Sequence, residues 1–308
     1  MNAFAFGERV MLIDVKARKY LITLKEGGEF HSHAGFVSHG DLIGQPEGIR
    51  LRSTRNAVYT ALRPTLEDFV IEMPRGAQVI YPKDLAPICM IADIGPGMRV
   101  LESGIGSGAL SMTMLRYGAE IFGYELREDF LNRAVGNVRS FLGESALGRY
   151  HVELRDCYEG VDVEDLDRVV LDLPEPWRVI PHLPGKLRPG GILVAYTPSI
   201  TQAAQVRELL TGPTWIAQRT LEVLHRTWHI EGQAVRPDHR MVAHTGFLTT
   251  ARYLGDLAPL PASQRLIQAQ IGADEPSVSG VEMDGSSDAG IGEGSADQRS
   301  GDDDPVGE

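Results

Sequence analysis

Cysteine is scarce in this chain, and long apolar runs are missing from it. Only two cysteines, Cys89 and Cys157, occur among 308 residues, so we expect neither a disulfide framework nor a cysteine-based metal site. No stretch reaches the roughly 20 apolar residues that a membrane-spanning helix needs. The first residues also lack the basic and apolar segments of a secretion signal. We therefore expect a cytoplasmic protein with no membrane partner and no metal.

Positive charge is also in deficit, but the deficit is local. The chain has 30 Lys and Arg against 42 Asp and Glu, a net charge of −12. Residues 272–308 hold eleven acidic residues and one arginine, and subtracting their −10 leaves −2 for residues 1–271. Segment 272–308 is rich in Gly and Ser and has no apolar periodicity, which predicts a disordered acidic tail. The near-neutral remainder argues neither for nor against a nucleic-acid partner.

Hydrophobic patterning divides the rest of the chain into three parts. Residues 1–64 alternate apolar and polar side chains in short runs between glycine turns, which predicts a small antiparallel β domain. Residues 65–98 form a connector with a helix from Asp84 to about Ile94. Residues 99–271 repeat strand, turn and helix, which predicts an α/β doubly wound, Rossmann-like sheet.

The last part of this α/β region has a different pattern. Two late strands, Trp215 to Ile230 and Met241 to Tyr253, have no clear helix between them. Because parallel strands need a crossover connection, usually a helix, we expect these two strands to form an antiparallel pair at one edge of the sheet.

A glycine loop marks the expected ligand site. Gly104, Gly106 and Gly108 stand between an apolar strand and a predicted helix, where doubly wound sheets bind nucleotide-type ligands. The spacing alone also fits a dinucleotide fingerprint. Glu125, about 20 residues further on, suits the ribose hydroxyls of either ligand.

Two other acidic residues favour one ligand over the other. Glu102 precedes the first glycine by two residues, a pattern that resembles motif I of class I methyltransferases. A carboxylate there lies near the cationic methionine end of S-adenosylmethionine, whereas a dinucleotide presents an anionic pyrophosphate to this loop. Asp156 follows a later strand, where such enzymes place an acid against the adenine amino group. The pattern favours S-adenosylmethionine over a nicotinamide cofactor.

A second strand end carries the candidate catalytic residue. The apolar run Val169–Leu171 delivers Asp172 to the carboxyl edge of the predicted sheet, followed by Leu173-Pro174-Glu175-Pro176-Trp177. Ligand sites of open α/β sheets lie at this edge. The alternative is a structural aspartate that caps the next turn, and the proline-rich, aromatic context favours the functional interpretation.

Several histidines and an arginine remain open to two interpretations. His31, His33 and His39 have no cysteine nearby, so we expect surface or RNA-facing side chains rather than a metal site. His244 and Arg240 either face the site or support the late strands.

Over residues 1–255 the sequence resembles the bacterial and archaeal tRNA (adenine-58-N1)-methyltransferases. The segments that carry this resemblance, besides the glycine loop and the Asp172 strand end, are Glu29–His33, Gly40–Gly44, Met73–Asp84 and Arg236–Leu248. The resemblance implies methylation of adenosine 58 in the T-loop of tRNA, a homotetramer and Asp172 as catalytic carboxylate. It implies that Tyr81 and Tyr196 line the target-base pocket. The cofactor contacts that it implies are Ser107, Gly108, Ala109, Leu110, Glu125, Phe130, Asp156 and Asp172.

Adenine chemistry gives Asp172 a defined role. The N1 nitrogen of adenine has a lone pair and needs no base, but it must be unpaired and aligned with the methyl carbon. A carboxylate that accepts a hydrogen bond from the N6 amino group aligns the ring and stabilises its developing positive charge. Two alternatives remain: an adenine N6 methyltransferase, and a non-catalytic RNA-binding subunit of the same fold.

Overall fold

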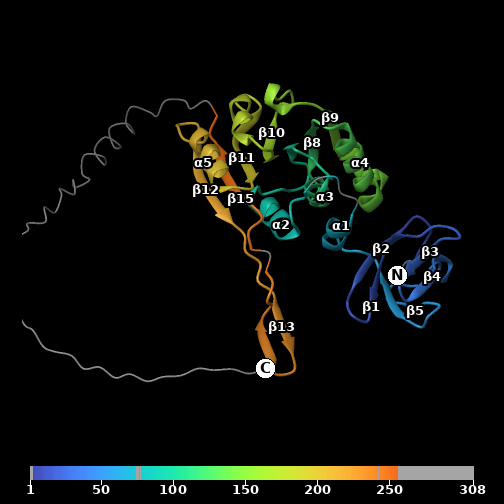
Figure 1. The fold of residues 1–308 in the computed structure, drawn as a ribbon. Helices are drawn as coiled ribbons and strands as arrows, with labels where there is room; N and C mark the ends of the chain where they lie inside the picture. Colours follow the sequence, from blue (N-terminus) through green and yellow to red (C-terminus); the bar gives the residue numbers. More distant parts are fainter. Residues whose placement is uncertain (1–2, 74–75, 77, 242, 256–308) are drawn as a thin grey trace, which may run out of the picture. The chain divides into compact units, whose positions relative to one another are not determined.

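The carboxyl-terminal part of the protein is built on one mixed sheet. The computed structural model describes residues 3–73, 76, 78–241 and 243–255. Seven strands lie in the order β12-β15-β11-β10-β7-β8-β9 (Figure 1). Their bounds are β7 Arg99–Ser103, β8 Glu120–Glu125, β9 Tyr150–Leu154, β10 Leu166–Asp172, β11 Leu187–Thr197, β12 Trp215–Glu222 and β15 Phe247–Tyr253. The pairs from β11 to β9 are parallel, which confirms the predicted Rossmann-like sheet.

Both faces of this sheet are covered. Successive residues of a strand point to opposite faces, and neighbours along the strands belong to two different apolar clusters. Val100 and Val170 pack in one cluster with Ile88 of α2 (Pro82–Ile91), whereas Leu101 and Leu171 pack in the other. The apolar run Val169–Leu171 within β10 is typical of a parallel strand buried on both faces.

Five α-helices occur in the described part of the chain. They are α1 Leu66–Glu72, α2 Pro82–Ile91, α3 Ala109–Arg116, α4 Glu128–Leu142 and α5 Ile200–Leu209. The connector therefore contains α1 in addition to the predicted helix, and α2 begins two residues earlier than expected. Thr65 caps α1 by accepting from the Asp68 N–H, while the Asp68 carboxylate accepts from the Thr65 N–H. This reciprocal cap satisfies two N–H groups that a helix start leaves free.

The two late strands are shorter in the structure than the sequence predicted. β12 ends at Glu222 and β15 begins at Phe247, and a separate hairpin of β13 (Trp228–Glu231) and β14 (Ala234–Pro237) lies between them. Gly232, with φ +55°, opens a two-residue turn between the hairpin strands, and glycine favours this turn because it tolerates positive φ. The predicted antiparallel pairing itself is confirmed, since β12 and β15 pair at one edge of the sheet.

The amino-terminal residues form a smaller β structure. Its sheet has the order β2-β1-β6-β5 and is antiparallel throughout. A separate hairpin of β3 and β4 lies between β2 and β5 in the sequence. The bounds are β1 Arg9–Asp14, β2 Lys19–Thr23, β3 Glu29–Ser32, β4 Gly35–Ser38, β5 Arg50–Arg52 and β6 Val58–Leu62. Val10, Leu12, Tyr59 and Ala61 form much of its own core.

The predicted domain boundaries stay predictions, because every described residue belongs to one compact unit. The predicted disordered tail, residues 272–308, lies outside the described residues. No helix in the described part of the chain combines the length and apolarity needed to span a membrane.

Candidate functional site

The glycine loop is held against the end of β10. Gly104 has φ +86°, and a methyl group built on it overlaps the main-chain oxygen of Asp172. Its N–H donates to the main-chain oxygen of Tyr124 at 3.1 Å, which ties the loop to β8 as well. Only glycine combines this backbone angle with this closeness. The loop and Asp172 are therefore fixed relative to each other by the backbone.

Glu125 closes the opposite side of the loop. This residue ends β8 and is buried. Its two carboxylate oxygens accept from the Gly106 N–H and the Arg127 N–H, each at 3.0 Å. A carboxylate oxygen has two lone pairs, so each oxygen retains one for a ligand hydroxyl.

Glu102 is the most deeply buried acid of the site. It is 1% exposed, and one of its oxygens accepts from the Ser111 hydroxyl at 2.7 Å. The other, Oε1, has no hydrogen-bond partner among the described residues. Burial, followed by repulsion from Asp172 and Glu125, raises the pKa of Glu102 to about 8. Because a buried oxygen without a partner is costly, this atom indicates a ligand that brings a cation or a donor.

Asp172 stands at the carboxyl end of β10, between the glycine loop and β11. The register pairs it with Tyr196 of β11. Burial and repulsion from Glu125 raise the pKa of Asp172 to about 7. A bound cation favours the charged form of a nearby carboxyl group, so a cationic ligand here restores both Asp172 and Glu102 to their ionised forms.

Two cavities that share several lining residues gather most of the predicted cofactor residues. The larger, about 470 Å³, is lined by Gly104, Gly106, Glu125, Phe130, Asp156 and Asp172. A smaller one, about 20 Å³, shares Gly104, Gly106 and Asp172 with it and adds Glu102, Ser107, Ala109 and Leu110. The combined space falls in the range of small-molecule sites. An orphaned acid at one end and Glu125 and Asp156 along the wall fit S-adenosylmethionine, which has a cationic end, ribose hydroxyls and an adenine amino group.

Three predicted site residues line neither cavity. Gly108 caps α3, and a side chain there would lie 3.2 Å from the Ala134 backbone, so the structure gives it a packing role. Tyr81 precedes α2 and is 37% exposed. Tyr196 is buried, and its hydroxyl donates to the Thr245 main-chain oxygen at 2.7 Å. Tyr196 lies at the Asp172 side of the site because the two residues are paired in register, and Tyr81 is joined to Tyr196 through hydrogen bonds of Asp84 and Thr245.

The structure adds residues that the sequence analysis did not name individually. Gln78 lines both cavities, and it lies in the connector segment that carried the family resemblance. Arg127 stacks its guanidinium 3.8 Å from the Phe130 ring centre, and its place two residues after Glu125 was an available signal. Tyr158 also lines the larger cavity and accepts the Glu175 N–H at 3.0 Å, a contact that no sequence spacing indicates.

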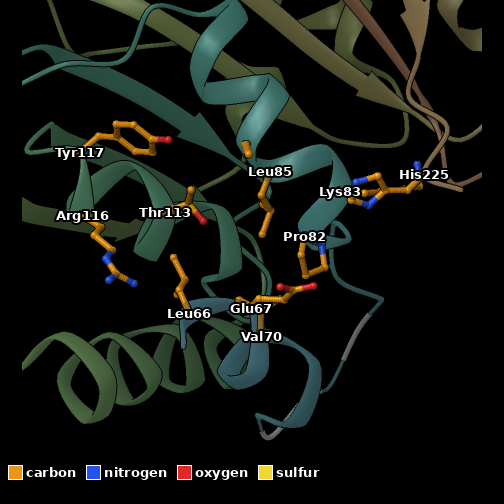
Figure 2. Close-up of a pocket in the computed structure, with 11 residues that line it drawn as sticks. Leu66, Glu67, Val70, Pro82, Lys83, Leu85, Thr113, Arg116, Tyr117 and His225 are labelled. Atoms are coloured by element: carbon orange, nitrogen blue, oxygen red, sulfur yellow. The ribbon is translucent and has the colours of Figure 1, made fainter. Parts of the chain in front are cut away.

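A further cavity of about 530 Å³ lies among α1, α2 and α3 (Figure 2). Leu66, Val70, Leu85 and Tyr117 form its apolar walls. It lacks a glycine turn and a set of converging carboxylates, so the chemistry favours the smaller space beside Asp172 although this one is larger.

The histidines have structural partners in several cases. His244 bonds Glu222 at 2.7 Å through Nδ1 and the Pro198 main-chain oxygen at 2.8 Å through Nε2, so it supports the edge strands. His39 accepts from the Lys25 N–H at 3.1 Å. Within the described ranges, no three His, Cys, Asp or Glu side chains are grouped closely enough to hold a metal ion.

The fold and this site define a class I S-adenosylmethionine-dependent methyltransferase, with S-adenosylmethionine as the cofactor. The family model described as tRNA methyltransferase complex GCD14 subunit matches residues 57–236, and the TrmI-like N-terminal model matches residues 3–50. The chain belongs to this family of tRNA methyltransferases, as the sequence resemblance predicted.

Known relatives agree with this placement. The tRNA (adenine(58)-N(1))-methyltransferase TrmI of Thermus thermophilus is 37% identical over 248 residues, covering 79% of this chain and 96% of the relative. The crystal structure of an S-adenosylmethionine-dependent O-methyltransferase from Thermotoga maritima has a TM-score of 0.79 at 28% identity, covering 83% of this chain and 96% of that one. The tRNA (m1A58) methyltransferase TrmI of Aquifex aeolicus has a TM-score of 0.72 at 27% identity, covering 82% and 99%.

Proposed function

We propose that this enzyme transfers a methyl group from S-adenosylmethionine to N1 of adenosine 58 in the T-loop of tRNA. The names of the Thermus and Aquifex relatives support this substrate. The observation that carries the proposal is the position of Asp172, at the carboxyl edge of the sheet, on the wall of the cofactor cavity and paired in register with Tyr196.

Each acidic residue of the cavity would bind a different group of the cofactor. The orphaned Glu102 oxygen would accept from the methionine ammonium group, and the free lone pairs of Glu125 would accept from the ribose hydroxyls. Asp156 would accept from the adenine amino group through Oδ2, since its Oδ1 already accepts from the Tyr158 N–H at 2.9 Å. When bound, the cofactor supplies an electrophilic methyl group on a positively charged sulfur.

Asp172 would act on the target base. Its carboxylate accepts a hydrogen bond from the N6 amino group and thereby turns the N1 lone pair toward the methyl group. As N1 forms its new bond, the adenine ring becomes cationic, and the adjacent carboxylate stabilises that charge. Tyr81 and Tyr196 would form aromatic walls for the base after it has left the T-loop stack.

The family resemblance extends the proposal to assembly and location. We expect a homotetramer in the cytoplasm, and light scattering coupled to size-exclusion chromatography measures the assembly directly. A monomer under conditions of full activity would contradict the tetramer.

The deciding experiment is nucleoside mass spectrometry of unmodified tRNA incubated with the protein and S-adenosylmethionine. We expect N1-methyladenosine from the native protein, little from Asp172→Ala, and none on a transcript with guanosine at position 58. N6-methyladenosine as the first product would support the N6 alternative, and the two isomers separate because only the N1 product is cationic near neutral pH. Cofactor binding without any methylated nucleoside would support a non-catalytic subunit.

A further inference from the structure

A buried polar cluster is hydrogen-bonded to the two tyrosines of the proposed base pocket. It consists of Lys83, Asp84 and Thr245, whose side chains are bonded to one another although Thr245 is more than 160 residues from the other two. The Lys83 side chain is 6% exposed and that of Asp84 is 0% exposed. Burying ionic groups destabilises a fold unless every charged group has hydrogen-bond partners, so a buried cluster of this kind suggests a specific role.

Every charged group of the cluster is satisfied. The Lys83 ammonium donates to Asp84 Oδ1 at 2.9 Å, to the Val223 main-chain oxygen at 2.6 Å and to the Thr245 hydroxyl at 2.5 Å. The Thr245 hydroxyl donates in turn to Asp84 Oδ2 at 2.6 Å. An ammonium group has three protons, and all three have acceptors. Such a fully connected network fixes its members in one arrangement.

The cluster continues directly into Tyr196. Thr245 holds the cluster with its hydroxyl, and its main-chain oxygen accepts from the Tyr196 hydroxyl at 2.7 Å. The next residue, Gly246, leaves the space that the Tyr196 ring occupies, because a side-chain carbon there would lie 2.5 Å from the ring carbon Cζ. The turn at Thr245 and Gly246 therefore accepts the Tyr196 hydroxyl and leaves room for the hydroxyl end of its ring.

The other end of the cluster is attached to Tyr81. Asp84 is the third residue of α2, where the helix start favours a negative charge. Its N–H donates to the Tyr81 main-chain oxygen at 2.8 Å. Lys83, beside it in α2, lies at one end of the cavity in Figure 2. The cluster thus connects the residue before α2 with the turn before β15 and with β11.

We infer that Lys83, Asp84 and Thr245 are positioning residues that hold Tyr81 and Tyr196 as the two aromatic walls beside Asp172. The inference rests on the proposed function, which makes these tyrosines the walls of the base pocket. None of the three acts on the base directly. Their effect is to fix where the base stops relative to Asp172, and misplacement by about 1 Å can cost about 100-fold in rate.

The test compares threonine substitutions on the full-length protein. Thr245→Val removes the hydroxyl at nearly constant volume, and Thr245→Ser keeps it. The matched control is Thr249→Val, because Thr249 is also buried and its hydroxyl bonds Thr220, at 3.0 Å, outside the cluster. For each variant we would measure kcat and KM for tRNA, the Kd for S-adenosylmethionine and the Tm.

We expect Thr245→Val to lower kcat/KM for tRNA by about 10-fold to 100-fold. The cofactor Kd should change by less than about twofold, because the glycine loop forms the cofactor site and the substitution leaves it intact. Thr245→Ser should recover most of the activity, and Thr249→Val should retain it. Unchanged activity of Thr245→Val would overturn the inference. So would a loss that serine does not restore and that the cofactor Kd shares, since that pattern describes general damage. If Thr245→Val does not fold, Asp84→Asn preserves volume and should give the same separation of activity from cofactor binding.

A readout without catalysis separates this inference from the proposed function. Replacing the nine tyrosines with 3-fluorotyrosine gives fluorine resonances, of which Tyr196→Phe identifies one. We expect Thr245→Val to shift or broaden the Tyr196 resonance and Thr249→Val to leave it in place. If the native protein forms no N1-methyladenosine, the proposed function fails, and this comparison still decides the positioning: an unmoved Tyr196 resonance in Thr245→Val overturns it.

Discussion

Gly104 lies so close to the main-chain oxygen of Asp172 that no side chain fits between them. The loop that would receive the cofactor and the strand end that would receive the base are thus in direct backbone contact. Gly104 and Asp172 line the same two cavities. A disturbance of one is therefore transmitted to the other without any side-chain intermediary.

Gly104→Ala tests this contact. We expect loss of both cofactor binding and methyl transfer, because the added methyl group meets the Asp172 backbone and the positive φ penalises alanine, each by about 1–3 kcal/mol. Cofactor affinity is measured by calorimetry. The control is Gly136→Ala in α4, where the new methyl group has open space and the helix gains about 0.5–1 kcal/mol. Equal effects of the two substitutions would contradict the steric explanation.

Asp172→Asn tests the charge at the proposed reaction centre. The amide keeps the shape of the side chain but stabilises a cationic ring poorly, so kcat should fall by about 100-fold to 1,000-fold. Initial rates of N1-methyladenosine formation give this value. Asp167→Asn is the matched control, since Asp167 lies near the other end of β10 and bonds Arg99 and Arg188. Full activity of Asp172→Asn would remove the carboxylate from the mechanism.

Glu102→Gln tests the orphaned oxygen. A hydrogen bond to a charged group contributes about 1.5–3 kcal/mol, so the cofactor Kd should rise by about 10-fold to 100-fold. The difference should be greatest above pH 8, where Glu102 is ionised before the cofactor binds. Glu120→Gln, at the beginning of β8, serves as the control for calorimetric titrations. A wild-type Kd in Glu102→Gln would show that the ammonium group binds elsewhere.

Stability of the cofactor-free protein should depend on pH through the same residue. The pKa of Glu102 is about 8 in the folded protein against an ordinary value of 4.5, so the folded protein holds this proton more tightly than the unfolded chain. The resulting stabilisation is complete below pH 4.5 and is lost as the pH rises through 8. Asp172, raised from 3.8 to about 7, adds in the same direction.

Urea unfolding at several pH values in this window measures the effect. Glu102→Gln should flatten the fall in unfolding free energy, because glutamine does not titrate. Saturating S-adenosylmethionine should also flatten it, since a bound cation lowers both pKa values. A native profile that rises through the window would mean that Glu102 is ionised in the cofactor-free protein.

Local patterns predicted the parts of the site that one strand end and its loop determine. Glu102, Gly104 and Asp172 were identified because each lies at or just after the carboxyl end of an apolar strand, and parallel strands end at a common edge. Contacts between residues that are distant in the sequence were harder to predict. Nothing in the sequence indicates that Thr245 bonds Asp84, because 161 residues separate them and neither has a diagnostic neighbour.

The errors in the fold have equally local causes. The short helix α1 was missed because seven residues are too few for a clear periodicity, although its Thr65 and Asp68 cap was readable. Most of β13 was merged into the first late strand, which was predicted to run to Ile230, and β14 was missed because it lies between the two predicted strands. The glycine turn at Gly232 was the signal that separates them.

The pairing of Asp172 with Tyr196 has a consequence for how this site can vary. Adjacent strands lie about 4.8 Å apart because their main chains are hydrogen-bonded, so the ladder sets the interval between the backbones of these two residues, and the turn at Thr245 then holds the ring. Loops around the site can lengthen, and surface residues can drift, without altering that interval. A one-residue slip of β11, however, would turn Tyr196 to the opposite face. The backbone of the acceptor site is thus insensitive to changes in the surrounding loops and intolerant of insertion within the two strands.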